Sequence, residues 1–348
     1  MSSCHILPTI TAITDRSIKM TDRVRFSLCV CVALVSCFLA LSFGAASTSM
    51  SDVLHSLISQ GSDEFIQRII LQLRMPRMIL AFLAGAGLAL AGLILQTVTR
   101  NPLADPYLFG ISSGASFGVV CFISLTGVSF GFSMSIAAFL GSLLSMFLLI
   151  GIAGRRHVGQ VEAMLLAGVA LSFLFSALTS LLLYFSDPQA ITAILFWTMG
   201  SFSRAEWGTL WIPLTVIIAC MTLIIAFRRQ LNAMLLGDES AATLGIHAQR
   251  FRILMLLLSS LITAVLVAMC GGVGFVGLMI PHIVRYFTSQ GSSHNLLMTS
   301  LVGGTFMVWV DVLCRTLLTN QELPVGVITA AIGSVFFLSL LYFRKQRR

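Results

Sequence analysis

Charged side chains are scarce in this sequence. Asp, Glu, Lys and Arg make up 10% of its 348 residues, whereas 57% of the residues are hydrophobic and the mean hydropathy is +0.97. Soluble domains usually contain about 25% charged residues. The composition therefore excludes a soluble protein and predicts a chain that lies mostly within a membrane.

Patterns that would support catalysis or metal binding are also missing. No G-x-x-x-x-G-K-[ST] motif occurs, so the chain has no Walker A loop that could hold ATP phosphates. The eight cysteines form no C-x-x-C pair, and the six histidines show no metal-ligand spacing. We therefore expect no catalytic residue, no metal site and no bound cofactor in this chain, and we expect the cysteines to be packing residues.

Acidic residues are fewer than basic residues, which gives the chain a net charge of +8. A positive charge of this size first suggests a nucleic-acid partner. The basic residues, however, lie at the ends of apolar segments and not along one polar surface. We expect them to be topology signals, with membrane lipid around the chain and no nucleic acid bound to it.

The sequence is organised around residues 74–115. Residues 78–98 contain no ionisable side chain and, at about 1.5 Å per residue, are long enough to cross a hydrocarbon core of about 30 Å. Gly85, Ala89 and Gly92 recur at helical spacing, so a neighbouring backbone can approach closely on that face. These residues predict a transmembrane helix that is buried among other helices.

Several motifs in this stretch carry a family resemblance. They are RMPR at residues 74–77, the pattern of Gly85, Leu88, Gly92 and Gln96, the turn NPLADP at residues 101–106, and Gly110, Ser112, Gly114 and Ala115. Together they resemble the signature of the FecCD-type permeases, the membrane subunits of ABC importers for ferric siderophores, haem and vitamin B12. The resemblance implies an all-α polytopic membrane protein with a vitamin B12 permease-like fold and about ten transmembrane helices.

Ten apolar segments agree with this fold. They cover residues 26–43, 78–98, 108–126, 132–153, 164–185, 210–227, 253–270, a shorter segment that ends at IPHIVR, and residues 296–318 and 327–343. The first segment ends in GAAS, like a signal peptide, but it is longer than a typical one, so we expect a transmembrane helix. Residues 187–206 are only partly apolar and predict a re-entrant or interfacial helix.

The expected organisation is one permease domain, residues 24–343, between a cytoplasmic N-terminal segment, residues 1–23, and a cytoplasmic tail, residues 344–348. The start codon, Met1 or Met20, stays open. An even number of crossings places both termini on one side of the cell inner membrane. If that side is cytoplasmic, every Lys and Arg faces the cytoplasm except Arg68, Arg74, Arg77, Arg204 and Arg315, as the positive-inside rule expects.

Arg74, Arg77 and Arg315 have two interpretations. They could anchor the chain to lipid headgroups. Alternatively, their guanidinium groups could form sockets for carboxylates, and the resemblance implies that they dock a periplasmic or lipid-anchored substrate-binding protein. Arg315 also lies four residues after Asp311, so the two side chains share a helix face, where we expect them to pair.

Residues 228–252 form the longest polar loop on the expected cytoplasmic side. Its short amphipathic segments would expose apolar side chains unless a partner covers them. The resemblance implies that this is the coupling loop, which contacts the ATPase subunit through Leu236, Gly237, Ala241, Leu244 and Gly245. A solvated connector is the alternative.

The resemblance also implies a gate at the cytoplasmic end of the transport pathway. Asn101 and Leu103 of NPLADP match one side of it. Val161 and Glu162 lie where the opposing side is expected, although the vitamin B12 member has small hydroxyl residues there. Glu162 has an alternative role as an ordinary carboxylate at a helix N-terminus.

The function that the resemblance implies is translocation of an iron chelate, with a ferric siderophore as the first candidate and haem or vitamin B12 as alternatives. A separate pair of ATPase subunits would bind ATP and Mg, and a second permease copy would complete a homodimer, or a different permease a heterodimer. An ion-coupled secondary transporter would need ionisable residues at mid-membrane, and an intramembrane enzyme would need a catalytic constellation there. The apolar segments contain almost no such residues.

Overall fold

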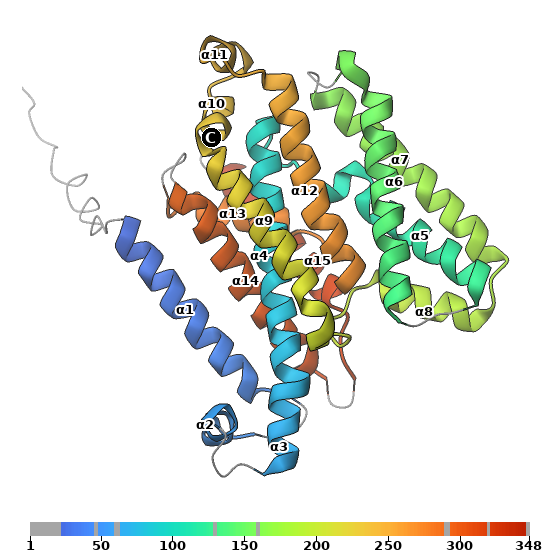
Figure 1. The fold of residues 1–348 in the computed structure, drawn as a ribbon, viewed down its shortest axis with the longest axis vertical. Helices are drawn as coiled ribbons and strands as arrows, with labels where there is room; N and C mark the ends of the chain where they lie inside the picture. Colours follow the sequence, from blue (N-terminus) through green and yellow to red (C-terminus); the bar gives the residue numbers. More distant parts are fainter. Residues whose placement is uncertain are drawn as a thin grey trace, which may run out of the picture.

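The computed structural model describes residues 22–44, 48–58, 63–127, 131–157, 161–288, 293–318 and 321–345. In these residues all regular secondary structure is helical, and no strand occurs (Figure 1). Most of the predicted N-terminal segment, residues 1–23, and of the predicted tail, residues 344–348, lies outside the described residues.

Within the described part of the chain, 8 helices are long and apolar enough to cross a membrane. They are α1 (Asp22–Ser42), α4 (Met75–Thr99), α6 (Phe132–His157), α7 (Val161–Tyr184), α9 (Trp207–Ala226), α12 (Ala248–Cys270), α14 (Ser293–Thr316) and α15 (Val325–Lys345). The shorter helices α5 (Ile111–Thr126) and α13 (Val276–Val284) account for the remaining two predicted segments. The predicted all-α membrane fold is confirmed.

Short helices form the connections. α2 (Met50–Ile58) and α3 (Glu64–Arg68) lie at one end of the bundle, and α10 (Arg228–Leu235) and α11 (Asp238–Thr243) lie at the opposite end (Figure 1). A π-helix, η1 (Ile69–Arg74), joins α3 to α4, and a 3-10 turn, η2 (Pro106–Phe109), precedes α5. α8 (Pro188–Thr198) falls in the segment predicted to be re-entrant or interfacial, and its 11 residues are too few to cross the hydrocarbon core.

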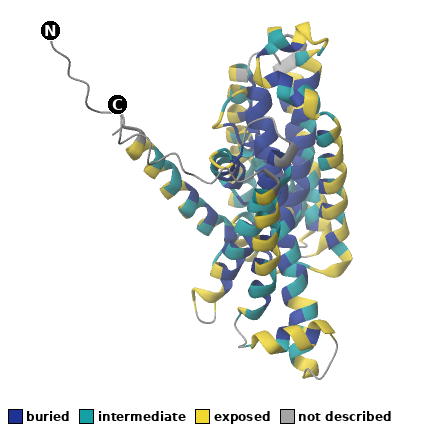
Figure 2. Cartoon of the chain, turned by 90° about the vertical axis from the view of Figure 1, so that its left-hand side faces the viewer, coloured by how far each residue is buried: buried dark blue, intermediate teal, exposed yellow. Residues whose placement is uncertain are grey.

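Helix α4 lies at the centre of the bundle. In the segment Glu64–Thr99, which contains it, 89% of the most apolar window is buried, whereas this share is 17% for α7 and for α15. Helices α12, α13 and α14 pack against α4, and Figure 2 shows the buried residues concentrated in the central helices. This burial agrees with the prediction from the residue 78–98 segment.

Small residues allow the neighbouring backbones to approach α4. A Cβ atom added at Gly85 would overlap the carbonyl oxygen of Gly303 in α14, and one added at Gly92 would overlap that of Gly277 in α13. Packing of this kind holds membrane helices together, because lipid tails are as apolar as the side chains. The predicted close approach is therefore confirmed.

The outer helices α7 and α15 expose large apolar side chains. Phe173 and Leu181 on α7, and Leu338 and Leu341 on α15, are exposed. Exposed apolar side chains of this size require lipid or another protein chain against them.

Backbone hydrogen bonds link the segments at the C-terminal ends of α8 and α12 and at the start of α15. The N–H of Ser201 donates to the carbonyl oxygen of Cys270 at 2.8 Å, and the N–H of Gly326 donates to that of Met199 at 2.9 Å. Gly271 has a φ of +75°, a left-handed conformation that glycine adopts without strain. Backbone N–H and C=O groups at these helix ends lack partners within their own helix. They form hydrogen bonds with other segments, which is required where little water is present.

Replacing Gly85 with Val should destabilise the fold, because the new side chain would displace the backbone of α14. The expected loss is about 1–3 kcal/mol, the usual cost of overpacking a core. Gly151→Val in α6 is the matched control, since nothing lies within 4 Å of a Cβ added there. Thermal unfolding of both purified variants in detergent measures the difference, and equal melting temperatures would contradict the expectation.

Candidate functional site

The residues predicted to be functional lie at two opposite ends of the bundle. Arg74, Arg77 and Arg315 lie toward the end that carries α2 and α3, whereas the predicted gate and coupling residues lie toward the end that carries α10 and α11 (Figure 1). Helix α4 runs between these two ends of the bundle (Figure 1).

Asp311 is the centre of the first group. Its Oδ1 accepts a hydrogen bond from Nε of Arg77 at 2.8 Å, and its Oδ2 lies 3.5 Å from Nε of Arg315. Arg77 also donates through Nη1 to Oε1 of Glu322 at 2.6 Å. The side chain of Asp311 is 1% exposed, whereas that of Glu322 is 48% exposed. Arg77 thus links a buried carboxylate to one at the surface, and the predicted pairing of Asp311 with Arg315 is confirmed.

Arg74 and Arg315 hold the end of α1. Arg74 donates through Nη1 to the carbonyl oxygen of Leu41 at 2.7 Å, and Arg315 donates through Nη2 to that of Ala40 at 2.8 Å. The last carbonyl groups of a helix lack intrahelical partners and favour a nearby cation. Both arginines are buried. Arg77, in contrast, pairs with the exposed carboxylate of Glu322.

The partners of these arginines were only partly visible in the sequence. Asp311 and Arg315 share a helix, so their spacing revealed them. Glu322 is far from Arg77 along the chain, so spacing could not predict their contact. The acceptors on α1 are backbone carbonyl groups, which every residue has, so the residue types of α1 could not predict them either. The docking role of Arg74, Arg77 and Arg315 stays a prediction.

The predicted coupling residues belong to the α10–α11 hairpin. Leu236 and Leu244 are 70% and 64% exposed, whereas Ala241 is fully buried. Gly237 and Gly245 have φ values of +110° and +77°, which only glycine adopts easily, so they allow the chain to turn before and after α11. The hairpin presents two leucines outward while Ala241 packs inward, which is a suitable surface for an apolar partner contact.

Asp238 ties this hairpin to α4. Its two carboxylate oxygens accept hydrogen bonds from Nη2 of Arg252 in α12 at 2.8 and 2.9 Å, and Oδ1 also accepts from Arg100 at 3.2 Å. Arg252 is buried, and its Nε donates to the carbonyl oxygen of Val98 at 3.1 Å. The sequence did not suggest this link, because its members come from three separate segments.

The NPLADP turn follows directly after α4. Oδ1 of Asn101 accepts a hydrogen bond from the N–H of Leu103 at 3.0 Å, and Leu103 points outward. Asp105 is buried and accepts from the N–H of Tyr107 at 2.7 Å. Burial raises the pKa of the Asp105 carboxyl to about 6, because the charged form is poorly solvated there. The turn therefore has a fixed inner side and an exposed apolar tip.

The opposing side of the predicted gate lies at the start of α7. Glu162 is exposed in the first turn of this helix, where a carboxylate interacts favourably with the helix dipole. The side chain of Val161 lies outside the described residues. The gate formed by Asn101, Leu103, Val161 and Glu162 stays a prediction.

Comparisons with known proteins identify relatives along most of the chain. The FecCD transport family matches residues 32–343. The hemin transport system permease protein HmuU of Yersinia pestis is 35% identical over 315 residues, which cover 88% of this chain and 93% of that protein. The cobalamin import system permease protein BtuC of Halobacterium salinarum is 38% identical over 289 residues, which cover 82% of this chain and 77% of that protein.

A solved structure has the same fold. It is an inward-facing conformation of a metal-chelate type ABC transporter, with 32% sequence identity, a TM-score of 0.81 and coverage of 92% of this chain and 99% of that one. The relatives are permease subunits, which are not enzymes, and a separate ATPase is their partner. This chain therefore belongs to the FecCD transport family, as a multi-pass membrane permease of the ABC importers for metal chelates, haem, vitamin B12 and similar compounds.

Proposed function

We propose that this chain forms the membrane pathway of an importer for a ferric chelate, with a ferric siderophore as the first candidate and haem or vitamin B12 as alternatives. Hemin and cobalamin, named for two relatives, and the cargo of the metal-chelate type transporter are all metal complexes of organic ligands. The observation that carries the proposal is the presence of two separate surfaces, an arginine cluster and an apolar hairpin, at opposite ends of the buried helix α4.

The proposed assembly contains further chains. A pair of ATPase subunits binds ATP and Mg and contacts Leu236 and Leu244, so the permease itself needs no cofactor. A second copy packs against the exposed apolar faces of α7 and α15 to form a homodimer, with a heterodimer of two different permeases as the alternative. The assembly lies in the cell inner membrane, with α10, α11 and both termini on the cytoplasmic side.

The arginine cluster is proposed to receive the periplasmic or lipid-anchored binding protein. Arg77 already binds the half-exposed carboxylate of Glu322, which has the chemistry of the carboxylate expected on the incoming protein. The partner's carboxylate would replace Glu322 at Arg77 while Asp311 keeps the guanidinium in place. Arg74 and Arg315 would support docking by holding α1 at the rim of this surface.

Asp238 is proposed to transmit movement of the coupling hairpin. It binds Arg252 of α12 and Arg100 at the end of α4, so a displacement of α11 pulls on both helices. Arg100 directly precedes the NPLADP turn, which contains the predicted gate residues Asn101 and Leu103. In this proposal the two ion pairs of Asp238 connect the ATPase contact to the predicted gate.

Proteoliposomes that contain this permease, its ATPase and its binding protein should accumulate labelled ferric siderophore only when ATP is supplied. Haem and cobalamin are tested in the same assay. ATP-dependent accumulation of one of these two in place of the siderophore would correct the cargo, and accumulation driven by an ion gradient without ATP would overturn the proposed mechanism.

Arg77→Gln should weaken docking of the binding protein at least about tenfold, since a lost pair of this kind costs more than 1.4 kcal/mol. Glu322→Gln should preserve or strengthen docking, because it removes the internal competitor. Arg68→Gln is the control, since Arg68 is an exposed arginine in α3 whose ion pair with Glu64 lies within the same helix. Surface plasmon resonance measures the affinities. Equal weakening by Arg77→Gln and Glu322→Gln would show that Glu322 is itself the docking contact.

Asp238→Asn should lower ATP-driven uptake roughly tenfold, the effect of about 1–2 kcal/mol of lost coupling. The ATPase should still bind, because Leu236 and Leu244 are unchanged. Glu239→Gln is the matched control, because Glu239 is the exposed neighbour of Asp238 on α11. Uptake and ATPase pull-down are measured together, and equal uptake by the two variants would refute the role of Asp238.

A further inference from the structure

A basic cavity lies beside the coupling hairpin. It has a volume of about 300 Å³ and is bounded by α4, α10, the end of α13 and the start of α14. Its polar lining includes Arg100, Arg228 and Arg285, and none of its described lining residues carries a carboxylate. Leu93 and Leu296 are among the leucines that form its apolar part. The cavity thus combines positive charge with apolar surface.

Arg228 and Arg285 differ from the third arginine of this cavity, Arg100, which pairs with Asp238. Arg285 donates through Nη2 to Oε1 of the buried Gln96 at 2.7 Å, and Gln96 donates in turn to the carbonyl oxygen of Gly277 at 2.9 Å. Among the described residues, no carboxylate lies within 4.0 Å of Arg228 or Arg285. A partly buried cation that is oriented by a neutral amide and lacks a carboxylate favours binding of an anion.

The start of a candidate membrane span lies beside the cavity. The apolar span of α1 begins at Val24, and Arg25 next to it donates to the carbonyl oxygen of Phe287 at 2.6 Å. Phe287 and Tyr286 directly follow Arg285 and are 60% and 70% exposed. Exposed aromatic residues beside the start of a membrane span mark the membrane–water interface. An anion that reaches Arg285 at this depth comes most directly from the bilayer.

We propose that this cavity is a binding site for an anionic phospholipid, whose headgroup phosphate pairs with Arg228 and Arg285 while its glycerol region contacts the leucines of the lining. Basic pockets between membrane helices on the cytoplasmic side bind acidic lipids for the same electrostatic reason. Because the cavity adjoins α10 and Arg100, a bound lipid stabilises the junction of the coupling hairpin with α4.

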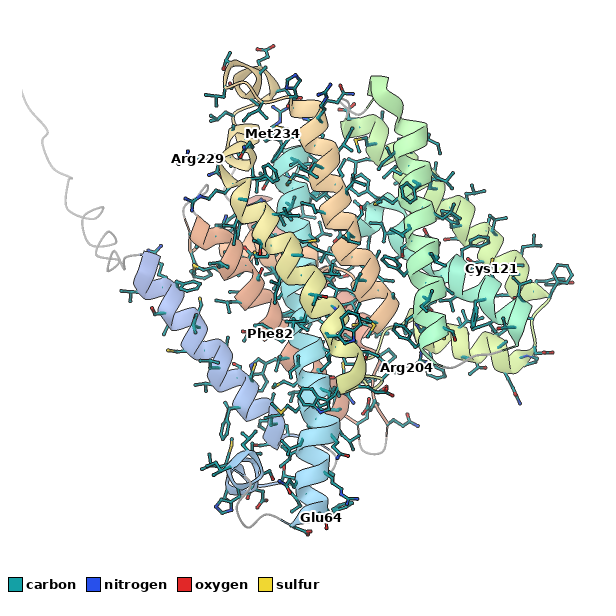
Figure 3. All side chains as sticks on the ribbon, in the orientation of Figure 1. Glu64, Phe82, Cys121, Arg204, Arg229 and Met234 are labelled. Atoms are coloured by element: carbon teal, nitrogen blue, oxygen red, sulfur yellow. The ribbon has the colours of Figure 1, made fainter. Side chains whose placement is uncertain are left out.

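Native mass spectrometry of the purified, delipidated chain tests this site. Phosphatidylglycerol and phosphatidylcholine with the same acyl chains are titrated separately. We expect tighter binding of phosphatidylglycerol, and we expect Arg228→Gln and Arg285→Gln each to weaken it about fivefold, as about 1 kcal/mol per arginine implies. Arg229→Gln is the matched control. Arg229 is the neighbouring arginine of α10 (Figure 3) and is not among the residues that line the cavity. The Arg229→Gln substitution removes the same charge, so this variant should bind phosphatidylglycerol with the affinity of the unmodified chain.

Three results would overturn the assignment. Equal weakening by Arg229→Gln and Arg228→Gln would indicate general attraction to a basic surface. Equal binding of the two lipids would exclude recognition of the headgroup charge. Displacement of phosphatidylglycerol by inorganic phosphate alone at similar concentration would identify a site for a free anion. Arg285→Gln removes the Arg285–Gln96 hydrogen bond and can disturb folding. Arg228 is exposed, so Arg228→Gln tests the site without that change.

Discussion

Close contact between the backbone of α4 and its neighbours is the constraint on which the rest of the structure depends. Gly85 faces Gly303 of α14, and Gly92 faces Gly277 of α13, at distances that leave no room for a side chain. In a membrane such packing replaces the hydrophobic effect as the main force between helices. The central helix is therefore held along its length, and both of its ends have defined positions relative to α13 and α14.

The charged residues at the two ends of α4 follow a common arrangement. Asp311 forms ion pairs with Arg77 and Arg315 at one end, and Asp238 forms ion pairs with Arg100 and Arg252 at the other. An exposed ion pair contributes little to stability, but a buried guanidinium group without a partner is costly. Asp238 thus connects buried Arg252 to exposed Arg100. Asp311 connects buried Arg315 to Arg77, which in turn binds the exposed carboxylate of Glu322.

A permease of this family has no chemical step to perform, so its functional residues shape surfaces. The surface at the arginine cluster is polar and contains the half-exposed carboxylate of Glu322, whereas the surface of the α10–α11 hairpin is apolar and presents Leu236 and Leu244. The faces of α7 and α15 expose further large apolar side chains, which require lipid or a second chain against them. Partners that differ in chemistry can therefore bind the same molecule without competing for one surface.

The sequence by itself determined the apolar helices, the buried face of α4 and the grouping of the predicted functional residues toward two ends of the bundle. These features are local, because the length of an apolar run sets a membrane span and the spacing of small residues sets a helix face. Only the tertiary structure decided that Arg77 meets Glu322, that Asp238 meets Arg252, and that Arg74 and Arg315 bind the last carbonyl groups of α1. Contacts between distant segments leave no periodic pattern, and a backbone carbonyl acceptor is the same in every residue, so these partners become defined only when packing has placed the helices.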